Sequence, residues 1–158
     1  MASTHVLDRW MYKGGHPNRL ARTLNHIWSM LASRGVGPKG LCTLEVRGRR
    51  SGRTIAFPVV VADYEGERYL VAMLGNRANW VANVRASGGD AVLRHGGIEE
   101  VRLEDVAAAD RPAILRRYVA VAPGGRAHIG LDSDAALPDF EKIARDVPVF
   151  RIASRPSQ

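Results

Sequence analysis

The sequence predicts an α+β fold, in which short antiparallel strands form a barrel-like sheet and helices pack outside it. Two observations predict this class. Apolar segments of strand length are separated by turns rich in glycine, aspartate and asparagine, and four segments between or beside them carry helix signals. Because the 158 residues contain no repeat or low-complexity segment, a single domain over residues 1–158 is expected.

The first predicted element is an amphipathic helix over residues 16–34. Its apolar residues recur at helical spacing: Leu20, Leu24, Ile27 and Leu31. The glycines and proline of residues 35–38 end it, and residues 1–15, which close on two glycines, are expected to be loosely ordered. Because its other faces carry arginine and histidine, the helix either lies across the domain, which we favour, or rests on an anionic membrane surface.

The barrel is expected to span residues 41–152. Its strands are predicted at 41–46, 54–62, 68–74, 91–95, 98–103 and 147–152. Hairpin turns are predicted at residues 63–67 and 96–97, where glycines lie between paired apolar segments. Helices are predicted at 78–87, 110–120 and 137–145. The second of these helices has Pro112 in its first turn, where a missing backbone N–H costs nothing.

Composition and charge indicate a soluble protein with an anionic partner. The chain is 46% hydrophobic and 25% charged, and its 20 arginines and 3 lysines give a net charge of +7. The single cysteine, Cys42, excludes an intramolecular disulfide and is expected to pack within a strand. No apolar stretch reaches the ~18 residues of a membrane span, and no signal-peptide region is present. We expect a cytoplasmic protein, with the inner membrane face as the alternative location.

Several function classes lack their sequence signals. The chain has no G-x-x-x-x-G-K-[ST], G-x-G-x-x-G or G-x-S-x-G motif. Its five histidines show no metal-ligand spacing, so no metal is expected. Aromatic residues make up only 6% of the chain and form no stacking platform, so a nucleic-acid partner is not expected despite the charge.

The most informative segment is residues 47–53, with the sequence RGRRSGR between two predicted strands. Glycine lets the backbone approach a ligand closely, and a turn of this kind offers free N–H groups. Guanidinium groups match phosphate and carboxylate oxygens through paired hydrogen bonds. The segment therefore indicates either a site that binds a polyanion or a solvated loop that tolerates charge.

With a second segment, this loop resembles the deazaflavin (F420)-dependent nitroreductase and quinone reductase family of split β-barrel oxidoreductases. The resemblance rests on the order strand, Gly-Arg-Arg-Ser-Gly-Arg, strand with Phe57-Pro58, and then Gly75-Asn76, Asn79-Trp80 and Asn83. It covers residues 17–104 well and the C-terminal third more loosely. It implies a split β-barrel of mainly antiparallel strands, with an N-terminal helix and peripheral helices, that binds reduced F420 in a groove.

The resemblance also implies which residues bind the cofactor. The phosphate and tail carboxylates of F420 would be met by the loop residues Arg49, Arg50, Ser51, Gly52 and Arg53. The groove wall would be shaped by Phe57 and Pro58. The deazaflavin ring would lie beside Met73, Leu74, Gly75 and Asn76.

The following helix contributes three further candidates. Trp80 and Asn83 would support the ring-binding segment. Their simpler roles are those of a core anchor for Trp80, which we favour, and of a hydrogen-bonding residue on the helix face for Asn83. Arg85 would contact the cofactor tail or lie in solvent.

The catalytic candidate comes from a departure from the family pattern. Nitroreductases of the family carry tyrosines that line the substrate pocket, whereas residues 122–128 here contain none. This absence counts against nitroimidazole substrates and leaves the loop residue His128 as the candidate proton donor, because its ordinary pKa lies near neutrality. Tyr118 is a weaker candidate that is expected to pack.

The resemblance implies hydride transfer from reduced F420 to a small hydrophobic electrophile such as a quinone, a nitroaromatic or an enone. One alternative is a non-catalytic split barrel that binds a fatty acid or another hydrophobic ligand, with peripheral membrane contact through the N-terminal helix. Another is the same barrel with FMN as its cofactor. The intact arginine segment counts against both alternatives, because a lipid needs no polyanion site and FMN lacks the polyglutamate tail.

Overall fold

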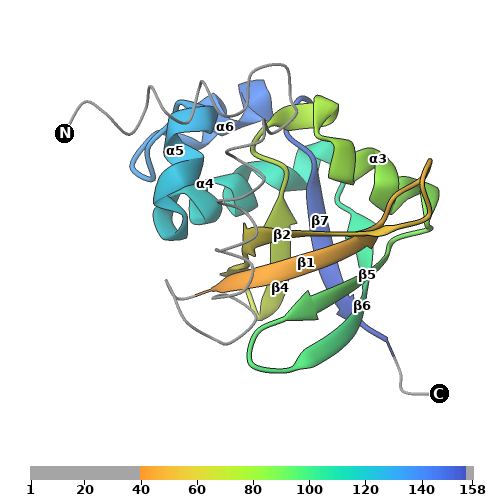
Figure 1. The fold of residues 1–158 in the computed structure, drawn as a ribbon. Helices are drawn as coiled ribbons and strands as arrows, with labels where there is room; N and C mark the ends of the chain where they lie inside the picture. Colours follow the sequence, from red (N-terminus) through yellow and green to blue (C-terminus); the bar gives the residue numbers. More distant parts are fainter. Residues whose placement is uncertain (1–39, 156–158) are drawn as a thin grey trace.

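The computed structural model describes residues 40–155, which form a curled antiparallel sheet with helices packed against it (Figure 1). The strands are β1 (Leu41–Arg47), β2 (Thr54–Val60), β3 (Ala62–Tyr64), β4 (Glu67–Val71), β5 (Asp90–Arg94), β6 (Ile98–Asp105) and β7 (Val149–Ser154). The α-helices are α3 (Asn79–Ala86), α4 (Arg111–Val121), α5 (Pro123–Ile129) and α6 (Leu137–Ile143), with the 3₁₀ helices η2 (Gly75–Arg77) and η3 (Ala108–Asp110). The predicted loose segment 1–15 and helix 16–34 lie outside the described residues.

The seven strands pair in the order β2-β1-β5-β6-β7-β4-β3, and every pairing is antiparallel. The β1–β2 hairpin has the longest continuous register, from Leu41 opposite Val60 to Arg47 opposite Thr54. Its outer strand, β2, contains Pro58, which is tolerated because one side of an edge strand needs no backbone donor. The predicted α+β class, with mainly antiparallel strands, is confirmed.

One hydrophobic core fills the inside of the curled sheet. Alternate strand residues such as Leu44, Leu93 and Val101 point into it, as the period of two in a strand requires. Helix α3 covers this core, and Trp80 lies between Phe57 of β2 and Phe150 of β7, with ring centroids 5.9 and 5.5 Å away. Since three strands separate β2 from β7 in the sheet, these contacts span its open side.

A second core lies on the outer face of β4 and β7, beneath α4 and α6 (Figure 1). The buried guanidinium of Arg111, at the start of α4, donates to the carbonyls of Val106 and Ala144, each at 2.8 Å, and of Val147 at 3.5 Å. Burial lowers the pKa of Arg111. Arg111 therefore ties α4 to the end of β6 and to the segment that enters β7.

Two predicted strands differ in extent from the expectation. The strand predicted at 54–62 is divided at Val61 into β2 and β3, and the Val61 N–H donates to the carbonyl of Gly40, which continues the β1–β2 register by one residue. The strand predicted at 68–74 ends at Val71, because the next residue, Ala72, accepts a turn hydrogen bond from the N–H of Gly75.

The interpretation of residues 122–128 as a loop was wrong, because most of them form helix α5. Glycines disfavour a helix interior, but here Gly125 packs directly against the ring of Tyr118. A Cβ atom on Gly125 would lie 2.5 Å from Tyr118 Cε1, so the close packing of α5 on α4 needs this glycine. Tertiary contact thus outweighs local propensity. None of the helices in residues 40–155 is long and apolar enough to cross a membrane.

Candidate functional site

The arginine loop, residues 47–53, is a preformed turn between β1 and β2. The N–H of Gly48 donates to the carbonyl of Arg53 at 2.8 Å, and the N–H of Gly52 donates to the carbonyl of Gly48 at 2.9 Å. Gly52 has a φ of 68°, which glycine adopts without strain. The hydroxyl of Ser51 accepts a third bond, from the N–H of Arg53 at 3.2 Å. The loop therefore has a defined shape before any ligand binds.

The charge of this loop is not compensated by the rest of the described chain. Its four arginines are exposed, and no carboxylate in residues 40–155 lies within 4.0 Å of any of them. The backbone N–H groups of Arg50 and Ser51 donate to no acceptor within the same range. Fixed positive charge beside free backbone donors is the pattern of an anion-binding turn.

Helix α3 forms the opposite wall of a cleft beside the loop. Asn83 is only 4% exposed, and its Oδ1 accepts from the N–H of Arg49 at 3.1 Å and from the Arg49 guanidinium at 2.8 Å. Asn79, one helical turn earlier, is exposed and faces the same space. The cleft has a volume of about 200 Å³ and is lined by Gly48, Arg49, Arg50, Ser51, Ile55, Asn79 and Asn83. The arginine loop and helix α3, which in the sequence are connected only by the family resemblance, thus lie on the two sides of one cleft.

The segment expected beside the deazaflavin ring precedes α3. Leu74 packs against the inner core and Met73 against the outer core, where Tyr118 Oη donates to Met73 Sδ at 3.5 Å. The N–H of Gly75 is already used by a turn hydrogen bond. The side chain of Asn76 donates to the carbonyl of Arg145 at 3.2 Å. The packing of this segment is therefore fixed from both cores.

Four further predicted residues occupy different positions around the inner core. Phe57 is half-buried against Trp80, and Trp80 takes the role of a core anchor. Pro58 lies opposite Thr43 in the β1–β2 ladder. Arg85 does not line the cleft.

The guanidinium of Arg85 is held by a carboxylate away from the arginine loop. It donates to Asp105 at 2.9 and 3.2 Å and lies over the ring of Phe150, 5.8 Å from its centroid. The hydrogen bonds to Asp105 raise the pKa of Arg85. A tail contact by Arg85 stays a prediction, which would require it to leave this carboxylate.

The two candidates for proton transfer lie on neighbouring helices. His128 is half-buried on α5. Tyr118 is buried on α4, as expected, and burial raises its pKa to about 12. Cys42 is also buried, and burial raises the pKa of its thiol, in agreement with a packing role.

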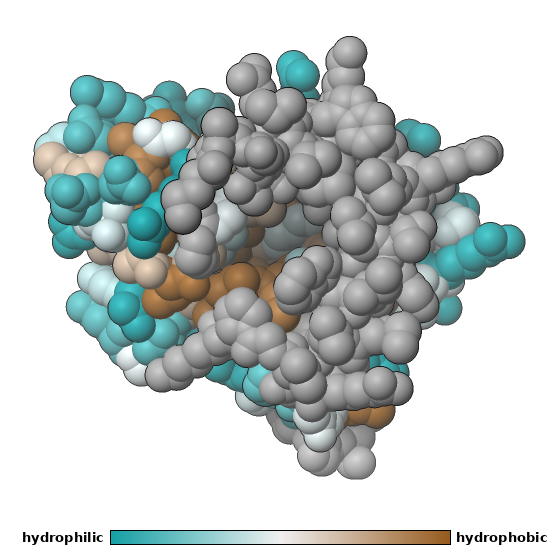
Figure 2. Space-filling view, turned by 60° about the vertical axis from the view of Figure 1, so that its left-hand side comes forward, coloured by the Kyte–Doolittle hydropathy of each residue, from teal (hydrophilic) through white to brown (hydrophobic). Residues whose placement is uncertain are grey.

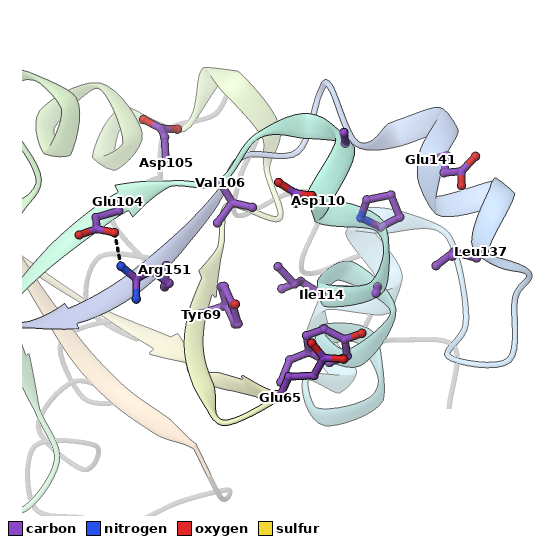
Figure 3. Close-up of a pocket in the computed structure, with 14 residues that line it drawn as sticks. Glu65, Tyr69, Glu104, Asp105, Val106, Asp110, Ile114, Leu137, Glu141 and Arg151 are labelled. Carbon is purple, nitrogen blue, oxygen red and sulfur yellow. Dashed lines mark hydrogen bonds and ion pairs between the residues drawn. The ribbon is translucent and has the colours of Figure 1, made fainter.

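A larger cavity of about 510 Å³ lies between the outer face of the sheet and helix α4 (Figure 3). Tyr64 and Tyr69 line it together with five carboxylates, from Glu65, Glu104, Asp105, Asp110 and Glu141. Its one basic residue, Arg151, is hydrogen-bonded to Glu104. This acidic cavity would repel a polyanion, so the smaller cleft at the arginine loop is the candidate site for an anionic ligand.

The model of the F420H(2)-dependent quinone reductase family matches residues 26–134, more than half of the chain. The chain belongs to this family. It is an oxidoreductase, and F420 is its cofactor. The predicted family and cofactor are thereby confirmed, and the comparison with curated proteins gives no match.

Solved structures with low sequence identity share the fold. A protein of unknown function from Agrobacterium tumefaciens has a TM-score of 0.56 and 12% identity, over 82% of this chain and 55% of that chain. A structure described as a domain-swapped dimer has a TM-score of 0.53 and 16% identity, over 80% and 91%. A conserved hypothetical protein from Mycobacterium tuberculosis has a TM-score of 0.50 and 20% identity, over 73% of each chain. These likenesses support the split β-barrel fold.

Proposed function

We propose that this chain reduces a small hydrophobic electrophile, in the first place a quinone, with the cofactor tail bound at the arginine loop. Nitroaromatics and enones are the other proposed substrate classes. When bound, reduced F420 supplies the hydride. The observation that carries the proposal is the arginine loop itself, whose positive charges and backbone donors have no acidic partner in the described chain.

The charges of the cleft fit the tail of the cofactor. A phosphodiester and glutamate carboxylates require several fixed donors, and guanidinium groups bind such oxygens in pairs. Arg50 and Arg53 are exposed, and we assign them as direct contacts, with the hydroxyl of Ser51 and the N–H groups of Arg50 and Ser51 beside them. A cleft of about 200 Å³ suits a charged tail, so the ring must lie next to it.

We place the ring beside residues 73–76, because that segment leads directly into the wall of the cleft. Asn79 lines the cleft and lies only two residues beyond Arg77, the end of η2. Phe57, Pro58 and Trp80 then form the wall between ring and barrel. Hydride transfer needs close positioning and the exclusion of water more than acid–base groups, and a segment packed on both cores supplies a rigid support.

We keep His128 as the proposed proton donor. The phenol of Tyr118, with a pKa of about 12, holds its proton too tightly to donate it near neutral pH. Helix α5, which carries His128, packs on Tyr118 through Gly125, and Tyr118 contacts Met73. This chain of contacts connects His128 to the segment proposed to bind the ring.

A hydrophobic substrate fits the apolar residues that border the outer core. Half-buried apolar residues border the outer core, among them Val60, Met73, Val121 and Ile129. Figure 2 shows hydrophobic side chains gathered at the centre of one face, with hydrophilic side chains towards its edges. Membrane contact through residues 16–34 stays a prediction, which cosedimentation with anionic vesicles tests.

The first experiment is a fluorescence titration of the purified protein with F420 and, in parallel, with FMN. We expect saturable binding of F420 and none of FMN, followed by oxidation of F420H2 that depends on an added naphthoquinone. Equal binding of the two cofactors would contradict the role of the arginine loop in recognising the tail. F420 binding without turnover of quinone, nitroaromatic or enone would contradict the proposed substrates, and lipid extraction would then test the fatty-acid alternative.

A further inference from the structure

We infer that Asn83 is a positioning residue: its side-chain oxygen sets the conformation of the arginine loop through Arg49. The inference rests on the proposed function of this loop as the site of the F420 tail. It changes the role that the sequence suggested for Asn83, from support of the ring-binding segment to support of the tail-binding loop.

The amide oxygen of Asn83 is placed to hold Arg49. Asn83 is 4% exposed and lies beside Val84, which is 1% exposed, in the helix that covers the inner core. Its Oδ1 already accepts two hydrogen bonds, both from Arg49. An amide oxygen accepts about two bonds, so this atom is fully used by Arg49, and the positioning role belongs to the oxygen and not to the amide nitrogen.

The two bonds join segments that are 34 residues apart in the chain. The bonds inside the loop, between Gly48, Gly52 and Arg53, set its turn but do not connect it to α3. Among the side-chain hydrogen bonds of residues 40–155, those of Asn83 are the ones that connect the loop to the helix. These bonds therefore fix the distance between the loop and α3, which is the width of the cleft.

Fixing Arg49 also orients the residues that follow it. The guanidinium of Arg49 turns back toward α3, whereas Arg50 and Ser51 are exposed, with N–H groups that donate to no acceptor in the described chain. A loop already held in its binding shape loses less conformational entropy when a ligand binds. Removing the acceptor of Asn83 should therefore weaken binding without removing any charge from the site.

The test compares Asn83→Leu with Asn79→Leu, which removes the same kind of side chain from the same wall of the cleft. Leucine keeps a similar volume in the core but cannot accept a hydrogen bond, and Asn79 makes no hydrogen bond to Arg49. Asn83→Ala is a second variant for the case that leucine does not fit. The dissociation constant for F420 is measured by fluorescence titration at several salt concentrations. The kinetic constants kcat and KM for F420H2 and the midpoint of thermal unfolding are measured for each variant as well.

We expect Asn83→Leu and Asn83→Ala to raise the dissociation constant and KM about tenfold, while kcat at saturating F420H2 stays within twofold of wild type. The salt dependence of binding should be unchanged, because all four arginines of the loop remain. Asn79→Leu removes a residue that lines the cleft but has no hydrogen bond to Arg49, so any loss that it causes should be equally large in wild type and in the Arg49→Ala background. In an Arg49→Ala background the effect of Asn83→Leu should shrink by at least half, because the two residues act as one unit.

Wild-type affinity in both Asn83 variants would overturn the inference. So would a weaker salt dependence like that of Arg50→Ala, or a loss in Asn83→Leu that is as large in the Arg49→Ala background as in wild type, because either result would mean that Asn83 does not act through Arg49. Failure of the wild-type protein to bind F420 is a different result, which would overturn the proposed role of the arginine loop as well.

Discussion

The arginines of the loop and the ion-paired arginines elsewhere in the fold differ in what faces them. Arg68 of β4 is held by Glu99 at 2.6 and 3.0 Å, and Arg85 of α3 by Asp105 at 2.9 and 3.2 Å. The four arginines of residues 47–53 face no carboxylate within the described chain. The net charge of +7 is thus a sum that includes arginines whose charge is neutralised within the fold and arginines, such as those of the loop, whose charge is not. A cluster of arginines without internal partners therefore indicates a ligand site better than the net charge of the whole chain does.

The strongest test of this difference removes the exposed arginines on the loop. Arg50→Ala with Arg53→Ala should weaken F420 binding by at least about a hundredfold, since each charge-assisted contact contributes about 1.5–3 kcal/mol. The fold should be unaffected, because both side chains are exposed. Titration with F420 measures the loss. The charge-matched control is Arg116→Ala with Arg145→Ala, two exposed arginines outside the cleft, and an equal loss in that control would mean that only net charge matters.

The converse test removes an arginine that is buried in the structure. Arg111→Met leaves the carbonyls of Val106 and Ala144 without their donor, so we expect it to lower the free energy of unfolding by about 3 kcal/mol. Urea denaturation measures the change. F420 affinity of the folded protein should stay at the wild-type level, and a variant with normal stability but weak binding would contradict the division between structural and ligand-binding arginines.

A third test gives the loop an internal partner of the kind found on the sheet. Ile55 is 42% exposed and lines the cleft with Arg49 and Arg50. Ile55→Glu places a carboxylate among these guanidinium groups, and we expect it to raise the dissociation constant for F420 about tenfold. Ile55→Gln is the uncharged control. If the two variants bind F420 equally well, the free charge of the loop does not contribute to binding.

The smallest expected effect concerns the Arg68–Glu99 pair on the sheet. The hydrogen bonds from Arg68 hold the pKa of Glu99 below its ordinary value. The folded state therefore favours the carboxylate, so the pair stabilises the protein above pH ~4.3, the value in the unfolded chain, and this contribution is lost as the pH falls through the folded pKa. The side chains are 41% and 39% exposed, so the contribution is below about 1 kcal/mol.

Glu99→Gln should therefore be slightly less stable than wild type at pH 7, and the difference should be smaller at pH 3. Thermal unfolding at both pH values measures the difference. A gap between the two proteins that widens in acid would contradict the direction of the pKa shift.

Local patterns in the sequence predicted the elements better than they predicted the contacts between them. Both hairpins and helix α3 lie where the turn glycines and apolar residues indicated. The position of the arginine loop followed from its own seven residues. The bonds between Asn83 and Arg49 could not be predicted from local patterns, because they depend on how α3 folds back over β1.

The partner of Arg85 and the acidic cavity illustrate the same limit. Asp105, at the end of β6, meets Arg85 because α3 and β6 pack on the same inner core. The carboxylates of the cavity come from the β3–β4 turn, the end of β6, η3 and α6, which lie far apart in the chain. Helix α5 was missed for a related reason, since the packing of Gly125 on Tyr118 overrides the weak helix propensity of glycine.

The position of β7 in the sheet has a consequence for the order of assembly during synthesis. Residues Val149–Ser154 lie between β6 and β4, and they join the four-stranded part β2-β1-β5-β6 to the hairpin β3–β4. Until these residues leave the ribosome, both parts expose unpaired edges, and Trp80 lacks its contact with Phe150. The half-barrel is therefore completed only once β7 has been synthesised, and a nascent chain that stalls before β7 presents unpaired strand edges in place of an enzyme.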